Sequence, residues 1–177
     1  MVLLRIQNYT FLANLVCLTA PPVDVLNDLF TRFDQIAKHR GLEKIKTIGD
    51  CYMAAAGLPV VVTDHADRAA KMSLDMLVAI QDFNASSQHP LNIRIGISSG
   101  AAVAGVIGKS KFVYDLWGDV VNTASRMESH GTAGRIQISD ATRQALLQPF
   151  SLEHCGVIKV KGKCEMSTWF LNKSDQH

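Results

Sequence analysis

Two long stretches with helical spacing of apolar residues, separated by a pair of strand-like segments, constrain the fold of this chain most. Val23–His39 and Asp64–Phe83 each carry apolar side chains at every third or fourth position, which predicts a helix with one apolar face. Asp64 is a candidate N-cap of the second helix. Between the helices, Glu43–Ala56 predicts two strands around a turn at Gly49-Asp50.

The rest of the chain adds short strands and two shorter helices. The predicted strands are Val2–Ile6, Leu91–Ser98, Ala101–Val106, Lys111–Tyr114, Arg135–Ser139, Val157–Lys161 and Met166–Leu171, and the helices are Asp119–Ser129 and Ala141–Leu147. Ser139 or Asp140 is predicted to cap the last helix. This alternation predicts an α+β fold in which helices cover one face of a mainly antiparallel sheet.

Composition places the chain among globular proteins and excludes several functions. The 177 residues suit one domain with a single core, and 47% of them are hydrophobic. A net charge of +2 is too small to indicate nucleic-acid binding. No apolar run approaches the ~18 residues of a membrane span, and the start of the chain lacks the features of a signal peptide. The four cysteines form no CxxC pair, so we expect reduced structural thiols in a reducing compartment.

The segment Lys44-Ile45-Lys46-Thr47-Ile48-Gly49-Asp50 is the first candidate for chemistry. A strand presents Lys46 on one face, and a turn assisted by Gly49 then presents the carboxylate of Asp50. A hard cation such as Mg²⁺ is bound by carboxylate oxygens together with substrate phosphates. The alternative is an ordinary hairpin in which Asp50 only helps to form the turn.

The second candidate is the segment from Phe112 to Glu128. Asn122 and Arg126 are four residues apart, so they lie on one helix face and can meet the same ligand. An Asn can bond a sugar hydroxyl, and an Arg can stabilise charge on a phosphoryl group. Asp115 can accept a hydrogen bond from an exocyclic amine. The alternative is an amphipathic surface helix, although its polar residues are poor helix formers.

The third candidate is Lys159-Val160-Lys161-Gly162-Lys163. Alternation places the three lysines on one face of a strand or hairpin edge, where a Lys can neutralise a polyphosphate. Solvated edge strands protected by lysines are common, and that is the simpler interpretation of this segment alone.

Together these motifs resemble the catalytic domain of class III nucleotidyl cyclases, of the adenylyl cyclase type. EKIKTIGD, GLP, DHA, RIGISSG, YDLWGDVVNTASRMES and VKGK all look like signatures of that family, in the family's order, from about Val2 to Leu171. The resemblance implies one domain over residues 1–177 with a ferredoxin-like βαββαβ core and extra elements. It also implies a head-to-tail dimer whose active sites, at the interface, convert ATP to cyclic AMP and pyrophosphate with two Mg²⁺ or Mn²⁺ ions.

The resemblance also implies a role for each matching residue. Lys46 and Asp115 would read adenine, because guanylyl cyclases typically carry Glu and Cys there. Asn122 would orient the ribose, Arg126 would stabilise the transition state, and Lys161 would hold the terminal phosphates. Arg94 would act from the other subunit. Asp50 and the backbone of Ile6 would bind metal.

One position departs from the family pattern. The family's first strand ends in Phe-Ala-Asp-Ile-x-Gly-Phe-Thr, and its Asp is the second metal ligand. Matching Tyr9-Thr10 to the end of that motif places Arg5 where the carboxylate belongs. A cation there removes a ligand and repels a metal.

Three explanations of Arg5 stay open: a catalytically impaired regulatory homologue, a subunit completed by a related cyclase subunit, or a start that is not the natural one. The partners implied are ATP and a second cyclase domain, with no nucleic acid and no membrane contact. We expect a cytoplasmic domain, alone or within a larger sensor or membrane protein. A distant alternative is an unrelated ferredoxin-like domain that binds a metabolite.

Overall fold

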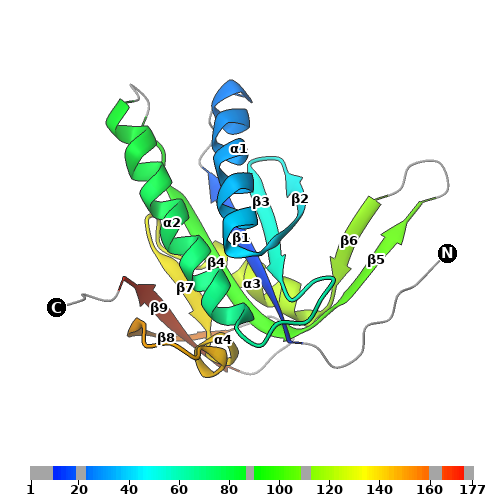
Figure 1. The fold of residues 1–177 in the computed structure, drawn as a ribbon. Coiled ribbons are helices and arrows are strands. Elements are labelled where there is room, and N and C mark those ends of the chain that lie inside the picture. Colours follow the sequence, from blue (N-terminus) through cyan, green and yellow to red (C-terminus); the bar gives the residue numbers. More distant parts are fainter. Residues whose placement is uncertain (1–9, 19–22, 87–89, 109–112, 160–164, 174–177) are drawn as a thin grey trace.

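The computed structural model describes residues 10–18, 23–86, 90–108, 113–159 and 165–173 of the chain (Figure 1). The elements are β1 (Thr10–Leu18), α1 (Val23–Arg40), β2 (Glu43–Ile48), β3 (Cys51–Ala56), α2 (His65–Ser86), β4 (Ile93–Ala101), β5 (Val103–Ile107), β6 (Val113–Trp117), α3 (Asp119–Ser129), β7 (Ile136–Ser139), α4 (Asp140–Ala145), β8 (Ser151–Lys159) and β9 (Glu165–Asn172). Within the described ranges, no helix is long and apolar enough to cross a membrane.

Seven strands form one sheet in the order β2-β3-β1-β4-β7-β9-β8, and β5 pairs with β6 in a separate hairpin. All pairings are antiparallel except that of β4 with β7. The first six elements run β1-α1-β2-β3-α2-β4, and their strands lie side by side. This arrangement confirms the predicted α+β fold with a βαββαβ core and extra elements.

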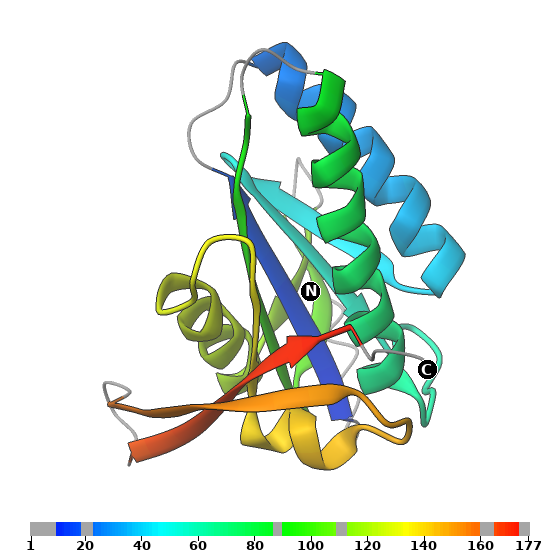
Figure 2. The same ribbon diagram turned by 90° about the vertical axis from the view of Figure 1, so that its left-hand side faces the viewer.

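Helices cover both faces of the sheet, whereas the sequence predicted one covered face. α1 and α2 lie together on one side, and α3 lies on the other (Figure 2). Successive residues of β3 point to opposite faces of the sheet and enter two different cores. Tyr52 packs with Phe33 beneath α1. Met53 belongs to the core beneath α3 and the β5–β6 hairpin, with Leu116 and Ala124. The prediction failed because β3 is buried on both faces, so its apolar run shows no alternation.

The first strand is not the one that the sequence predicted. β1 is Thr10–Leu18, and it pairs along its length with β3 on one edge and β4 on the other. The predicted strand Val2–Ile6 lies outside the described residues. Thr10 opens β1, although the match of Tyr9-Thr10 to the family motif required it to follow the strand, so that register is wrong. β1 itself contains no Asp or Glu.

The position of β1 supports a different register for the family motif. Placing the final Thr of Phe-Ala-Asp-Ile-x-Gly-Phe-Thr on Thr19 matches its Ala to Ala13 and puts the motif on β1 itself. Asn14 then stands where the carboxylate belongs, and Arg5 falls outside the motif. An amide oxygen can bind a hard cation but carries no negative charge. The departure from the family pattern therefore persists, with a neutral residue in place of the carboxylate.

Cys51 differs from the reduced thiol that the sequence predicted. It is disulfide-bonded in the structure, and the position opposite it in the register of β1 is Cys17. Directly opposed positions on antiparallel strands are close enough to be joined with little movement of the backbone. The spacing rules gave no sign of a bond at Cys51, because residues on neighbouring strands are brought together only by the sheet. Cys155 is an exposed free thiol, as expected.

Gly96 lets α3 approach β4 closely. A Cβ built on Gly96 would lie 2.2 Å from the backbone nitrogen of Glu128 and 2.3 Å from the carbonyl oxygen of Ala124. Because the obstacles are backbone atoms, a side chain can fit only if the helix moves off the sheet.

We therefore expect Gly96→Ala to lower the free energy of unfolding by more than about 2 kcal/mol in urea denaturation. Gly100→Ala is the matched control on the same strand, because its Cβ would meet only the Val120 side chain, at 3.3 Å. Equal denaturation midpoints for the two variants would contradict the close approach of α3.

Candidate functional site

Lys46 and Asp115 lie far apart in the sequence but form an ion pair. Nζ of Lys46 on β2 donates to Oδ2 of Asp115 on β6 over 2.6 Å. The side chains are 32% and 19% exposed, so the pair lies at the rim of the core and not in open solvent. The other carboxylate oxygen of Asp115 accepts from the backbone N–H of Leu116 at 2.8 Å. The carboxylate is therefore held in one orientation.

A β-bulge in β2 explains why Lys46 reaches this position. The register with β3 shifts between Lys44 and Lys46, so Lys44 lies opposite Ala54 and Lys46 opposite Met53. Without the bulge, two residues separated by one would share a face of the sheet. Lys44 instead turns towards α1, where it pairs with Asp34 at 2.8 Å. Lys46 is thereby directed to the α3 side.

An apolar layer lies beside the Lys46–Asp115 pair. Ile45, Met53 and Leu116 are buried in the core beneath α3, and half-buried Tyr114 packs against them. Burial raises the pKa of the Tyr114 hydroxyl, and the nearby charge of Glu43 adds to the effect. The apolar layer can take the face of a flat ring, while the Lys46 donor and the Asp115 acceptor bind polar atoms on the edge of that ring.

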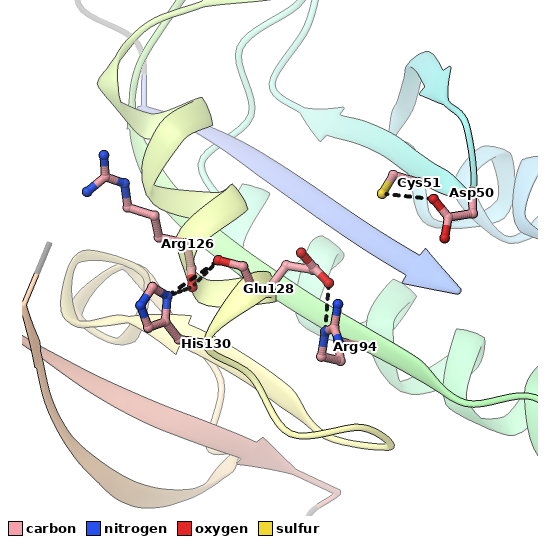
Figure 3. Close-up of polar contacts among 7 residues, drawn as sticks. Asp50, Cys51, Arg94, Arg126, Glu128 and His130 are labelled. Atoms are coloured by element: carbon pink, nitrogen blue, oxygen red, sulfur yellow. Dashed lines mark hydrogen bonds and ion pairs between the residues drawn. The ribbon is translucent and has the colours of Figure 1, made fainter. Parts of the chain in front are cut away.

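α3 carries Asn122 and Arg126 on its outer side. Its buried residues are Val120, Thr123, Ala124, Met127 and Glu128. Asn122 is exposed and Arg126 is half-buried. Figure 3 shows the Arg126 side chain extending away from Glu128, while its carbonyl oxygen accepts from His130 at the end of the helix. Asn122 and Arg126 therefore lie on the side of the helix that faces away from the core.

Arg94 lies on β4 and pairs with a buried carboxylate. Its Nε donates to Oε1 of Glu128 on α3 at 2.9 Å (Figure 3). The Glu128 side chain is 6% exposed and that of Arg94 is 39% exposed. The sequence predicted a role for Arg94 but none for Glu128. An acidic residue within the apolar stripe of the helix was the available signal, because buried carboxylates are rare unless they are paired.

Asp50 lies in the turn that joins β2 to β3. Gly49 before it has φ of +61°, a left-handed conformation that glycine adopts without strain, and so the tight turn forms. The sulfur of Cys51 lies 3.8 Å from Oδ1 of Asp50. Figure 3 shows this turn well separated from Arg126.

The described residues do not form a complete two-metal site. Among them, no group of three or more His, Cys, Asp or Glu side chains is arranged to hold a metal ion. Asp50 is a suitable single ligand, but β1, where the family pattern places the second carboxylate, has none. Three other residues of the prediction lie outside the described residues: Ile6, expected to bind metal, Arg5, expected in place of the second carboxylate, and Lys161, expected to hold phosphates.

Comparison with known proteins adds independent evidence. The family profile described as adenylate and guanylate cyclase catalytic domain matches residues 1–173. An adenylate cyclase of Mycobacterium tuberculosis is 43% identical over 155 residues, which are 86% of this chain and 35% of that protein. The chain therefore spans about a third of the length of this relative.

Two solved structures are closely similar. The guanylate cyclase domain of RhGC from Catenaria anguillulae, in complex with GTP, aligns with a TM-score of 0.87 and 38% identity, covering 93% of this chain and 97% of that one. The catalytic core of a rhodopsin-guanylyl cyclase with converted specificity, in complex with ATPαS, aligns with a TM-score of 0.86 and 38% identity, covering 94% and 96%. One of these similar structures holds GTP and the other holds ATPαS, so similarity alone does not choose between ATP and GTP.

Proposed function

The chain belongs to the family of adenylate and guanylate cyclase catalytic domains, and from this premise we propose that it acts on ATP to form 3′,5′-cyclic AMP and pyrophosphate. The ribose 3′-hydroxyl attacks the α-phosphate, and pyrophosphate leaves with the electrons of the broken P–O bond. The observation that carries the choice of ATP is the Lys46–Asp115 pair.

The pair matches the hydrogen-bonding edge of adenine. Adenine offers an acceptor at N1 and a donor at its 6-amino group, whereas guanine offers a donor at N1 and an acceptor at O6. The Lys46 ammonium can only donate, and the ionised Asp115 carboxylate can only accept. Their polar atoms are 2.6 Å apart, so one base edge can reach both. Guanine would place its N1–H donor against the Lys46 ammonium and its O6 acceptor against the Asp115 carboxylate. Neither hydrogen bond could form, which is unfavourable in a partly buried site.

The positions of the remaining residues support a dimer. Asp50 is well separated from Arg126 within the chain (Figure 3), although one reaction centre needs both kinds of group. In a head-to-tail dimer, the Lys46, Asp115, Asn122 and Arg126 of one chain would face the Asp50 and Arg94 of the other. Asn122 would orient the ribose, and Arg126 would stabilise the charge on the pentavalent phosphorus. Lys161 is proposed to hold the terminal phosphates.

The metal requirement of the family bears on which half of a site this chain supplies. When bound, two Mg²⁺ or Mn²⁺ ions would activate the nucleophile and clamp the phosphates in this family. Asp50 alone does not hold two such ions, and β1 offers no second carboxylate. We infer that this chain supplies the base-reading and transition-state half of a site whose metal carboxylates come from a related cyclase subunit.

A second candidate function is regulation without catalysis. The missing carboxylate on β1 favours it, because a homologue that binds nucleotide but cannot hold the metals could still control a partner through the dimer. In that case, the chain would bind ATP and alter its partner's activity but would form no product at its own Arg126.

A complementation assay tests the proposal. The partner is a related cyclase domain that keeps both metal carboxylates but has Ala in place of its own transition-state Arg, so that it is inactive alone. Mixed with this chain, ATP and Mn²⁺, it should give cyclic AMP, which can arise only from Arg126 of this chain. No cyclic AMP from this mixture would contradict the proposal. If the mixture forms no cyclic AMP from ATP but this chain still binds the analogue 3′-deoxy-ATP, which cannot cyclise, the regulatory alternative is favoured.

A further inference from the structure

We propose that Arg94 and Glu128 together act as a brace that positions Asn122 and Arg126, so that in this chain Arg94 is a positioning residue for the transition-state half of the site. The inference rests on the proposed function. It differs from the role implied for Arg94 by resemblance, in which this residue serves the site of the other subunit.

The ion pair joins a strand that is paired on both edges to the last turn of a helix. Arg94 belongs to β4, which is paired with β1 on one edge and β7 on the other. Glu128 belongs to the last turn of an 11-residue helix that packs on this strand. The 2.9 Å contact is charge-assisted, and Glu128 is almost fully removed from solvent. Such a carboxylate is held firmly, because leaving it without its cation would be costly.

The backbone around Gly96 fixes the height of the helix above the sheet. Gly96 is two residues after Arg94 on the same strand and therefore on the same face. The space that its missing side chain leaves is occupied by the backbone of Ala124 and Glu128. Contact at Gly96 sets the distance between helix and strand, and the ion pair beside it limits rotation of the helix about its own axis.

Rotation is the motion to which the outer residues are most sensitive. Glu128 lies on the buried side of α3, while Asn122 and Arg126 lie on the outer side. A side chain about 6 Å from the helix axis moves by about 1 Å when the helix turns by about 10°. A displacement of about 1 Å can reduce a rate by about a hundredfold. The brace therefore acts on the chemistry although neither of its members touches the reacting atoms at Arg126.

The complementation assay separates this role from the role implied by resemblance. In that assay, product forms only at the site that combines Arg126 of this chain with the metal carboxylates of the partner. Any arginine acting from the metal-binding side of that site is the partner's own. If Arg94 acted only in the other site, its substitution would not change the measured rate.

We expect Glu128→Gln and Arg94→Gln, each introduced into this chain only, to lower kcat in the complemented dimer by about ten- to a hundredfold. KM for ATP and the dissociation constant of 3′-deoxy-ATP should stay within about threefold, because the base pocket at Lys46 and Asp115 is untouched. The double variant should lose no more than the worse single variant, since the two residues act as one unit. Melting temperatures establish that each variant is folded.

Asp75→Asn is the matched control. It removes a comparable ion pair, because Nε of Arg40 donates to Asp75 at 2.6 Å on the opposite, α1–α2 side of the sheet. Its kcat should equal that of the unaltered chain. The brace is overturned if Glu128→Gln keeps full kcat, if Arg94→Gln alone lowers it, or if the two losses multiply. Absence of product with the unaltered chain contradicts the proposed function instead, and the brace is rejected with it.

Discussion

Replacing Lys46 by Glu together with Asp115 by Cys is expected to change the preferred substrate from ATP to GTP. The ratio of kcat/KM for ATP to that for GTP should fall from at least about 100 to below 1, because both hydrogen bonds to the base reverse direction. The existing ion pair disappears in this variant, and the introduced glutamate can then accept from the N1–H of guanine. The measurement is initial-rate kinetics with both nucleotides in the complemented dimer.

Lys44→Glu is the control for this exchange. It makes the same change of charge as Lys46→Glu, two residues away on β2, but the bulge directs Lys44 to Asp34 on the other face. It should leave the nucleotide preference unaltered. If Lys44→Glu changes the preference as much as the double exchange does, net charge and not base contact would be responsible, and the assignment of Lys46 and Asp115 would be wrong.

Arg126→Ala should cause the largest loss of rate among single substitutions. Removing a cation that stabilises charge formed only in the transition state lowers kcat by about 10²- to 10³-fold and changes KM little. Arg126→Lys should recover part of the loss, since charge returns without the guanidinium geometry. Steady-state kinetics with ATP in the complemented dimer distinguish the two parameters.

Arg68→Ala provides the comparison, because Arg68 pairs with Asp64 on the α2 side of the sheet, away from α3. Its kcat should be that of the unaltered chain. A raised KM with unchanged kcat for Arg126→Ala would mean that Arg126 binds ATP but does not stabilise the transition state.

Local patterns predicted the parts of the fold that carry the nucleotide half of the site. The α3 prediction, Asp119–Ser129, is confirmed without change, and the β2–β3 hairpin was found from its turn at Gly49-Asp50. Lys46 and Asp115, which the resemblance assigns to the same base, form an ion pair at 2.6 Å, while their role with adenine stays a prediction.

Features that depend on the sheet escaped prediction. β1 lies between β3 and β4, and a strand at the centre of a sheet has no alternation by which its start or register can be recognised. The error placed the carboxylate position of the family motif at Arg5, whereas the register that β1 supports places it at Asn14. The bulge between Lys44 and Lys46 and the pairing of Arg94 with Glu128 likewise arise from contacts between strands and helices, which no local spacing encodes.

The central claim is that this chain selects ATP and provides the transition-state groups for its cyclisation. The most direct measurement compares kcat/KM for ATP and GTP in the complemented dimer. In its productive site, Lys46, Asp115 and Arg126 all come from this chain. We predict cyclic AMP formation with ATP preferred by at least about a hundredfold. Preference for GTP, or equal use of both nucleotides, would contradict the claim.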